Sequence, residues 1–148
     1  MGKELIAIGP RIGDKRRTMA KSSKLVASRR GRVLLVRRRR DGLWTFPGGR
    51  KRARESAKRC LHRELGEELP SLRVRSAKLW RHVKGKNPIT GRRMNDAIFV
   101  VSEVEGVLEI GDTREIDKAE WREPWGLRLT PTSRFVRDQL FRRTKRRR

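Results

Sequence analysis

The sequence predicts a single α/β domain. Short segments rich in β-branched residues alternate with turn residues along the chain, and they flank one long amphipathic helix pattern. The chain has 148 residues, a length at which one domain is expected and a second independent core is not. It carries 41 Lys and Arg against 17 Asp and Glu, a net charge of +24, and its hydrophobic residues suffice for one modest core.

The N-terminal part of the chain divides into a basic segment and a predicted hairpin. Residues 1–22 are expected to be partly ordered at most, with a short strand at 5–8. The compact domain is expected to span residues 23–141. Strands are predicted at 24–28 and 33–36, because both are rich in β-branched residues and a Gly-containing turn separates them.

The next segment is expected to turn, extend and turn again. Four arginines at 37–40, followed by Asp41-Gly42, predict a turn. Residues 43–46 predict an extended piece that ends at Pro47-Gly48-Gly49. A glycine pair lets backbone groups approach a ligand closely because it has no Cβ atoms, which suits a phosphate and metal site.

Residues 55–69 predict a helix, since they contain no proline and only one late glycine. An apolar stripe recurs every four residues along it: Ala57, Leu61, Leu65 and Leu69. Pro70 is expected to end this helix, because the residue before a proline is disfavoured in the α region.

The C-terminal half predicts further strands and one more helix. Residues 72–83 and 97–104 predict strands joined by a turn-rich loop. A short strand is expected at 119–122, and a proline is expected to open a last helix at 131–141. Residues 142–148 are basic apart from one Thr and predict a solvated, disordered tail.

The sequence also predicts where the protein resides. The longest apolar run, at 97–101, is too short to span a bilayer, and 5–8 is too short for a signal peptide. A cytoplasmic protein without membrane contact is therefore expected. The single cysteine, Cys60, cannot form an internal disulfide, and no histidine lies at zinc-ligand spacing from it.

Three acidic residues share one face of the predicted helix. Glu64, Glu67 and Glu68 stand at i, i+3 and i+4, and their face lies roughly 100° around the helix from the leucine stripe. Three carboxylates this close repel one another unless a cation or solvent screens them, and hard oxygen ligands suit Mg²⁺ or Mn²⁺. The alternative is a solvated helix face with ion pairs such as Arg63 with Glu67.

These residues resemble the Nudix box of MutT-type Nudix hydrolases, G-x5-E-x7-R-E-U-x-E-E-x-G-U, where U is a bulky aliphatic residue. Gly49 is followed by five residues and Glu55, and then by seven residues and Arg63-Glu64-Leu65-Gly66-Glu67-Glu68. Both departures are terminal, since Pro70-Ser71 replaces Gly and the last aliphatic residue. We expect a proline stop instead of a left-handed cap, with Leu72 taking the apolar contact.

The resemblance implies a Nudix-type α/β/α sandwich with a mixed sheet and a catalytic loop and helix. It also implies hydrolysis of a nucleoside diphosphate linked to another group, by attack of water on phosphorus. The residues implied as metal ligands for Mg²⁺ or Mn²⁺ are Glu64, Glu67, Glu68 and a backbone carbonyl of Gly48 or Gly49. The implied supporting residues are Arg63 and Glu55, which orient the carboxylates, and Leu65 in the aliphatic position.

The general base of many Nudix hydrolases lies outside the box, on a loop before a strand that carries a Trp. Glu115 matches this pattern best, ahead of Glu103 and Glu120. The alternative is that Glu67 or Glu68 is the base.

The variable positions 50–54 of the box are cationic, whereas many family members carry an acidic residue and Gly there. We expect Arg50, Lys51 and Arg38 to contact substrate phosphates. The charge leaves open the same chemistry on a larger polyanion, such as a 5′-phosphorylated RNA end, a dinucleoside polyphosphate or an inositol pyrophosphate. It also leaves open a nucleic-acid-binding protein on a Nudix scaffold, with weak nonspecific contacts from the tail at 142–148.

Overall fold

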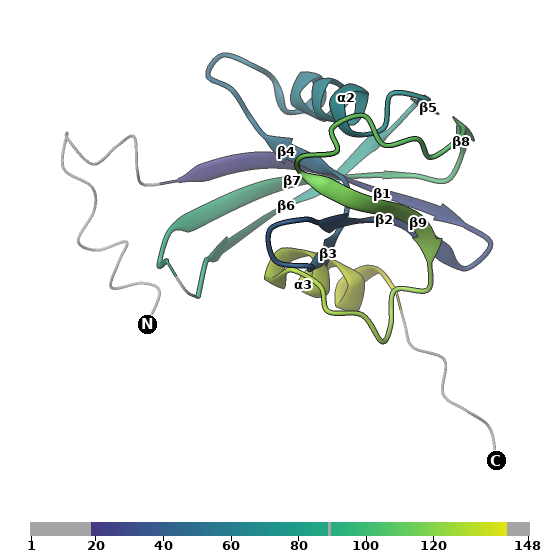
Figure 1. Ribbon diagram of the computed structural model, residues 1–148. Helices are drawn as coiled ribbons and strands as arrows, with labels where there is room; N and C mark the ends of the chain where they lie inside the picture. The colour runs from purple at the N-terminus through teal and green to yellow at the C-terminus, as the bar shows by residue number, and fades with distance from the viewer. Residues whose placement is uncertain (1–18, 89, 142–148) are drawn as a thin grey trace.

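The protein is built on one mixed sheet with a helix on each face (Figure 1). The structure, a computed structural model, describes residues 19–88 and 90–141. The strands of the large sheet run in the order β3-β2-β1-β7-β6, with β4 paired to β1 and β9 paired to β2. The elements are β1 (Ala20–Arg29), β2 (Arg32–Arg38), β3 (Trp44–Thr45), β4 (Gly48–Arg50), α2 (Ala57–Glu68), β5 (Leu72–Val74), β6 (Lys78–Lys86), β7 (Arg93–Val101), β8 (Val104–Gly106), β9 (Ile116–Arg122) and α3 (Pro131–Leu140). The expected α/β/α sandwich is confirmed.

The β1–β2 hairpin forms as predicted. Ser28 pairs with Val33, and the turn residues Arg30 and Gly31 both have positive φ, 51° and 78°, as a two-residue hairpin turn requires. Strand β1 also runs parallel to β7 through the middle of the sheet. Its side chains alternate, so that Leu25 packs toward α2 and Val26 toward α3.

The predicted apolar stripe of α2 forms one half of the core. Leu61, Leu65 and Leu69 are buried against Leu25, Phe99 and their neighbours on the sheet. Ser56 caps the N-terminus of the helix, and its hydroxyl accepts a hydrogen bond from the Arg59 backbone N–H at 3.1 Å. On the opposite face, Val136 of α3 packs into a second cluster.

One predicted turn is shorter than expected, and another is instead part of a strand. Residues 39–41 form the turn that was expected at 37–42. Residues 37 and 38 continue β2, because β9 pairs along them and Arg37 forms a bidentate ion pair with Asp117, at 2.8 and 2.9 Å. Gly48 and Gly49 form β4 and pair with β1, so the predicted turn at this place is wrong. In both cases the pairing strand is distant in sequence, and the local pattern carries no sign of it.

Each of the two long strands predicted in the second half is divided. The segment 72–83 breaks at Ser76, which has a φ of 59°, and separates β5 from β6. The segment 97–104 likewise separates into β7 and β8. Strands β5 and β8 then pair with each other in a small second sheet.

The ends of the domain lie close to the predicted ones where the structure describes them. Helix α3 begins with Pro131, and the Thr130 hydroxyl accepts a hydrogen bond from the Ser133 backbone N–H. Strand β1 begins at Ala20, three residues before the predicted start of the domain. The predicted strand at 5–8 and the tail at 142–148 lie outside the described residues. Within the described ranges, no helix is long and apolar enough to cross a membrane.

Candidate active site

Strand β4 and helix α2 meet in a close contact that places the predicted carboxylates. The Ser23 hydroxyl of β1 donates to the Ala57 carbonyl at 2.7 Å and so anchors the first turn of α2 to the sheet. A Cβ atom at Gly49 would collide with the Glu64 carboxylate. A side chain at position 49 would therefore displace Glu64, which explains the glycine at the start of the box.

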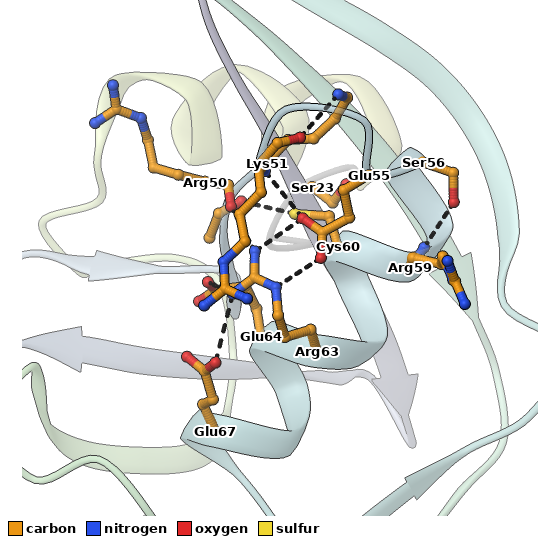
Figure 2. Close-up of polar contacts among 12 residues, drawn as sticks. Ser23, Arg50, Lys51, Glu55, Ser56, Arg59, Cys60, Arg63, Glu64 and Glu67 are labelled. Carbon is orange, nitrogen blue, oxygen red and sulfur yellow. Dashed lines mark hydrogen bonds and ion pairs between the residues drawn. The ribbon is translucent and has the colours of Figure 1, made fainter.

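Arg63 is the centre of the site, and Figure 2 shows its contacts. Its guanidinium donates to both Glu55 oxygens, at 2.6 and 2.9 Å, and to Glu64 at 2.7 Å. It also reaches Glu67 at 3.4 Å and the Arg50 carbonyl at 2.9 Å. The planar guanidinium thus ties the box loop to α2 and holds two of the predicted metal ligands.

The electrostatics of this cluster follow from the hydrogen bonds of Arg63. The hydrogen bonds from Arg63 lower the pKa of Glu55 to about 2, and the hydrogen bond from the Arg52 backbone N–H lowers it as well. The same contacts raise the pKa of Arg63 above its usual value. Glu55 and Arg63 are therefore a fixed pair of charges, and the predicted orienting role of both residues agrees with their geometry.

Glu68 occupies a different environment. Its side chain is buried, and one carboxylate oxygen accepts a hydrogen bond from the Gly48 backbone N–H at 3.2 Å. Burial raises the pKa of Glu68 to about 7, while the positive charge of Lys24 opposes the shift. The charges of Glu64 and Glu115 raise it further. One helix thus carries an exposed carboxylate, Glu67, and a buried one a single residue later.

The loop before β9 packs on the C-terminal end of α2. The Gly111 backbone N–H donates to the Glu68 carbonyl at 2.8 Å. A Cβ at Gly111 would collide with the Glu67 carbonyl and lie 2.9 Å from Pro70 Cδ. Residues 111–114 and Glu67 line a hollow of about 460 Å³, and Glu115 follows directly. The charge of Glu115 acts on Glu68, and its role as the general base stays a prediction.

The unusual end of the box has the expected geometry. Leu69 ends the helix with a φ of −136°, so no left-handed residue is used, and its N–H still donates to the Leu65 carbonyl at 2.8 Å. Leu72 packs against the core cluster beneath α2. The proline stop therefore leaves the carboxylates upstream undisturbed.

The carboxylates match a divalent metal in chemistry but are not gathered around a single point. No three His, Cys, Asp or Glu side chains of the described residues lie close enough together to hold one ion as they stand. Glu64 and Glu67 nevertheless both reach the Nη1 atom of Arg63, so their oxygens converge on one positive charge. Glu68 faces Gly48 instead. Two convergent carboxylates beside a third suit a hard cation.

The other predicted site residues have mixed positions. The Gly49 carbonyl accepts from the Cys60 thiol at 3.4 Å and so faces the helix. The Lys51 ammonium group donates to the Arg52 carbonyl at 3.2 Å. Arg38 is committed to an ion pair with Asp41. Arg50 contributes its carbonyl to Arg63, and its side chain is exposed. Leu65 lies in the core, as expected.

The NUDIX domain family model matches residues 22–143, most of the chain. This chain belongs to the Nudix family. Nudix hydrolases act on phosphoanhydride bonds of nucleotide-type substrates, and this protein is therefore a Nudix hydrolase. No curated protein sequence matches the chain significantly.

Solved structures of Nudix proteins share the fold. A MutT Nudix hydrolase from Burkholderia pseudomallei superposes with a TM-score of 0.76 at 22% identity, over 83% of this chain and 98% of that one. A Nudix hydrolase from Nitrosomonas europaea gives a TM-score of 0.68 at 17% identity, over 80% and 86% of the two chains. A mutator MutT protein from Bacillus halodurans gives 0.66 at 22% identity, over 79% and 78%.

The structure also adds residues that the Nudix box did not single out. Lys58, Arg59 and His62 lie on the outer side of α2, next to the cationic loop at 52–54. Their spacing of i, i+1 and i+4 shows that they share a helix face, and this was the signal available in the sequence. Their proximity to the loop depends on how the loop folds back.

Proposed function

We propose that this Nudix hydrolase is a divalent-metal-dependent pyrophosphohydrolase that cleaves a nucleoside diphosphate linked to another group. The observation that carries the proposal is the convergence of Glu64 and Glu67 on one positive charge, next to the buried Glu68. Such a set of carboxylates on one helix requires a cation for balance and supplies the oxygen ligands that Mg²⁺ or Mn²⁺ prefers.

Each side chain of the cluster has a proposed role. Glu64, Glu67 and Glu68 would hold the metal, with a backbone carbonyl of Gly48 or Gly49 as a further ligand. When bound, the metal neutralises charge on the pyrophosphate and lowers the pKa of water, which makes attack on phosphorus feasible at neutral pH.

Arg63 and Glu55 act as positioning residues in this proposal. Arg63 reaches Glu64 and Glu67 from one guanidinium, and Glu55 holds that guanidinium in place through two hydrogen bonds. Arg63 also limits the repulsion between the two carboxylates, because its charge lies between them. Ligand orientation therefore depends on two residues that need not touch the substrate.

The general base is proposed to be Glu115. The loop that carries Glu115 is fixed to α2 by the Gly111 hydrogen bond, and the Glu115 charge acts on Glu68. Glu67 and Glu68 are the alternatives. Glu115→Gln distinguishes them, because loss of a base lowers kcat by about 10²–10⁴-fold. If Glu115 is only a surface carboxylate, Glu115→Gln will leave kcat unchanged, and the base will be Glu67 or Glu68.

The proposal is tested with a panel of pyrophosphate substrates in the presence of Mg²⁺ or Mn²⁺. The panel includes oxidised nucleotides, dinucleoside polyphosphates, nucleotide sugars and 5′-triphosphate RNA. Glu67→Gln and Glu68→Gln should each lower phosphate or pyrophosphate release by more than about 10²-fold, and chelation with EDTA should abolish it.

The matched control is Glu105→Gln, which removes an exposed carboxylate of β8 far from the box in sequence. Among the described residues, the Glu105 carboxylate has one ion pair, a long one of 3.9 Å with Arg75. This control should retain full activity. Full activity in both box variants would overturn the proposal, and so would hydrolysis that continues in EDTA.

A further inference from the structure

A second hollow lies on the outer side of α2, separate from the one beside Glu67. It has a volume of about 700 Å³, within the range of ligand-binding clefts. We call it the cationic hollow. The residues that line it are the loop at 52–56 together with Lys58, Arg59, His62 and Arg63 of α2.

Acidic side chains of the described residues do not balance the charge of the cationic hollow. Its lining contains five Lys or Arg and one Glu, and that residue, Glu55, is already bound to Arg63. Within residues 19–88 and 90–141, no ion pair joins an acidic side chain to the other four cations, which are Arg52, Arg54, Lys58 and Arg59. Like charges gathered around one space repel one another, and an anion in that space would relieve the repulsion.

Arginines elsewhere in the protein show the contrast. Arg37 is bound to Asp117, and Arg137 is bound to Asp138 and stacks on Trp125. Arg39 donates to the Thr113 carbonyl. In those places an acidic, aromatic or carbonyl group of the protein satisfies the guanidinium. The described residues offer no such acidic or aromatic group to Arg54, Lys58 and Arg59 of the hollow.

The loop that forms the hollow is fixed before any ligand arrives. The Lys51 N–H donates to the Lys21 carbonyl of β1 at 2.8 Å, and the Arg52 N–H donates to Glu55 at 2.9 Å. Arg54 has a φ of 69°, a left-handed conformation that favours glycine. An arginine is held here in spite of that cost. A preorganised set of cations loses little entropy when an anion binds.

The hollow lies beside the proposed metal ligands. At about 100° per residue, Arg63 falls between the face of Lys58, Arg59 and His62 and the face of the carboxylates. In Figure 2, Arg59 and Glu67 lie on opposite sides of Arg63. The rise of about 1.5 Å per residue separates Arg59 from Glu64 by roughly 7–8 Å along the axis. A chain of several phosphates covers this distance, and a single phosphate does not.

We propose that the cationic hollow binds the phosphate chain of the substrate beyond the bond that is cut, so that the enzyme prefers linear oligophosphates. This inference deepens the proposed function. It rests on that function only for the direction in which the substrate's phosphate chain extends, from the cleaved bond toward the hollow. Binding itself depends on phosphate oxygens and on the Arg and Lys donors, which form charge-assisted hydrogen bonds with them.

The first experiment measures binding without hydrolysis. Inorganic tripolyphosphate and orthophosphate are titrated by calorimetry into the full chain in EDTA, in the Glu67→Gln background. Tripolyphosphate should bind at least tenfold more tightly than orthophosphate. Arg54→Gly combined with Arg59→Ala should weaken tripolyphosphate binding at least tenfold.

The matched control removes the same charge elsewhere. Lys78 and Arg134 are exposed residues of β6 and α3, and Lys78→Ala with Arg134→Ala should change the affinity less than twofold. Equal loss in the two double variants would overturn the proposal, because general attraction to a basic protein would then explain binding. A single-stranded RNA with a 5′-hydroxyl serves as a second probe. If the hollow variant lost RNA binding and kept tripolyphosphate binding, the hollow would be a nucleic-acid surface and the proposal would be wrong.

The second experiment uses turnover. In the wild-type background, the hollow variant should raise KM for a dinucleoside tetraphosphate at least tenfold more than KM for a nucleotide sugar. An equal change in both KM values would contradict the proposed direction of the chain. The outcomes for the two proposals remain distinguishable: tripolyphosphate binding without turnover refutes only the enzyme function, and turnover without this binding refutes only the hollow.

Discussion

The two sides of Arg63 differ in how their charges are balanced. On one side Glu64 and Glu67 share a guanidinium, and Glu68 is buried against a backbone N–H. On the other side the cations of the hollow have no acidic partner in the described part of the chain apart from the Glu55 that Arg63 occupies. Arg63 therefore offsets only part of the negative charge on the acidic side, whereas on the basic side no ion pair within the described residues offsets the other four cations of the hollow.

This difference separates two uses of charge on a single helix. Carboxylates proposed to hold a cation must be positioned accurately, and Arg63 and the close contact at Gly49 hold Glu64 in place. Cations meant to attract a polyanion need only be close together and accessible. Part of the +24 charge thus lies in the hollow, beside a small acidic cluster.

Among the variants that compare the two sides, the largest effect is expected from removing the residue that separates them. Arg63→Ala should lower kcat/KM by about 10–100-fold, because the carboxylates lose the group that orients them and repel one another. Arg63→Lys should restore little, since one ammonium group cannot replace a planar guanidinium with contacts to four residues. Steady-state kinetics over a Mg²⁺ titration measures the loss. Activity close to wild type in Arg63→Ala would mean that the carboxylates orient themselves.

A smaller effect, confined to the acidic side, is expected at Gly111. Gly111→Ala should destabilise the protein by about 1–3 kcal/mol, because the new Cβ meets the backbone at Glu67 and the ring of Pro70. It should also lower kcat by displacing the loop of Glu115, while tripolyphosphate binding persists. Gly66→Ala is the control, since no atom lies within 4 Å of its Cβ. Thermal or urea unfolding compares the two, and equal stability would refute the packing argument.

The basic side can be altered with the opposite effect on stability. Arg54→Gly should stabilise the protein by about 0.5–1 kcal/mol: a left-handed arginine costs about 1–2 kcal/mol, and the flexibility of glycine in the unfolded chain offsets about 0.5–1. The same variant should bind tripolyphosphate more weakly. A chemical denaturation curve and a titration on one protein sample test both. Loss of stability in Arg54→Gly would show that the arginine side chain supports the fold rather than a ligand.

The smallest effect concerns acid stability. Hydrogen bonds from Arg63 hold the pKa of Glu55 near 2, below its unfolded value of 4.5. The ionised Glu55 therefore contributes stability above pH 4.5, and that contribution is lost as the pH falls toward 2. Glu55→Gln should remove this part of the pH dependence, so the stability difference from wild type should shrink with acid. Parallel Tm curves from pH 7 to pH 2.5 would contradict the ion pair.

Much of the fold followed from local patterns, and the misses share one cause. The leucine stripe of α2, the first hairpin and the proline start of α3 depend on neighbours in sequence, and all were predicted. The turn predicted at Gly48-Gly49 and the long strand predicted at 72–83 were wrong. Pairing with strands that are distant in sequence decided the secondary structure at both places. Gly48 pairs with β1, and the first part of 72–83 pairs with β8.

By itself, the sequence determined the family and the set of acids, since the spacing of Gly49, Glu55, Arg63 and the helix carboxylates can be counted along the chain. Only the tertiary structure decided which of those acids are buried and where the basic residues meet. Glu67 and Glu68 are neighbours in sequence, yet burial raises the pKa of Glu68 to about 7 while Glu67 remains exposed. Burial and the folding back of the 52–56 loop depend on contacts between distant segments, and local spacing cannot specify them.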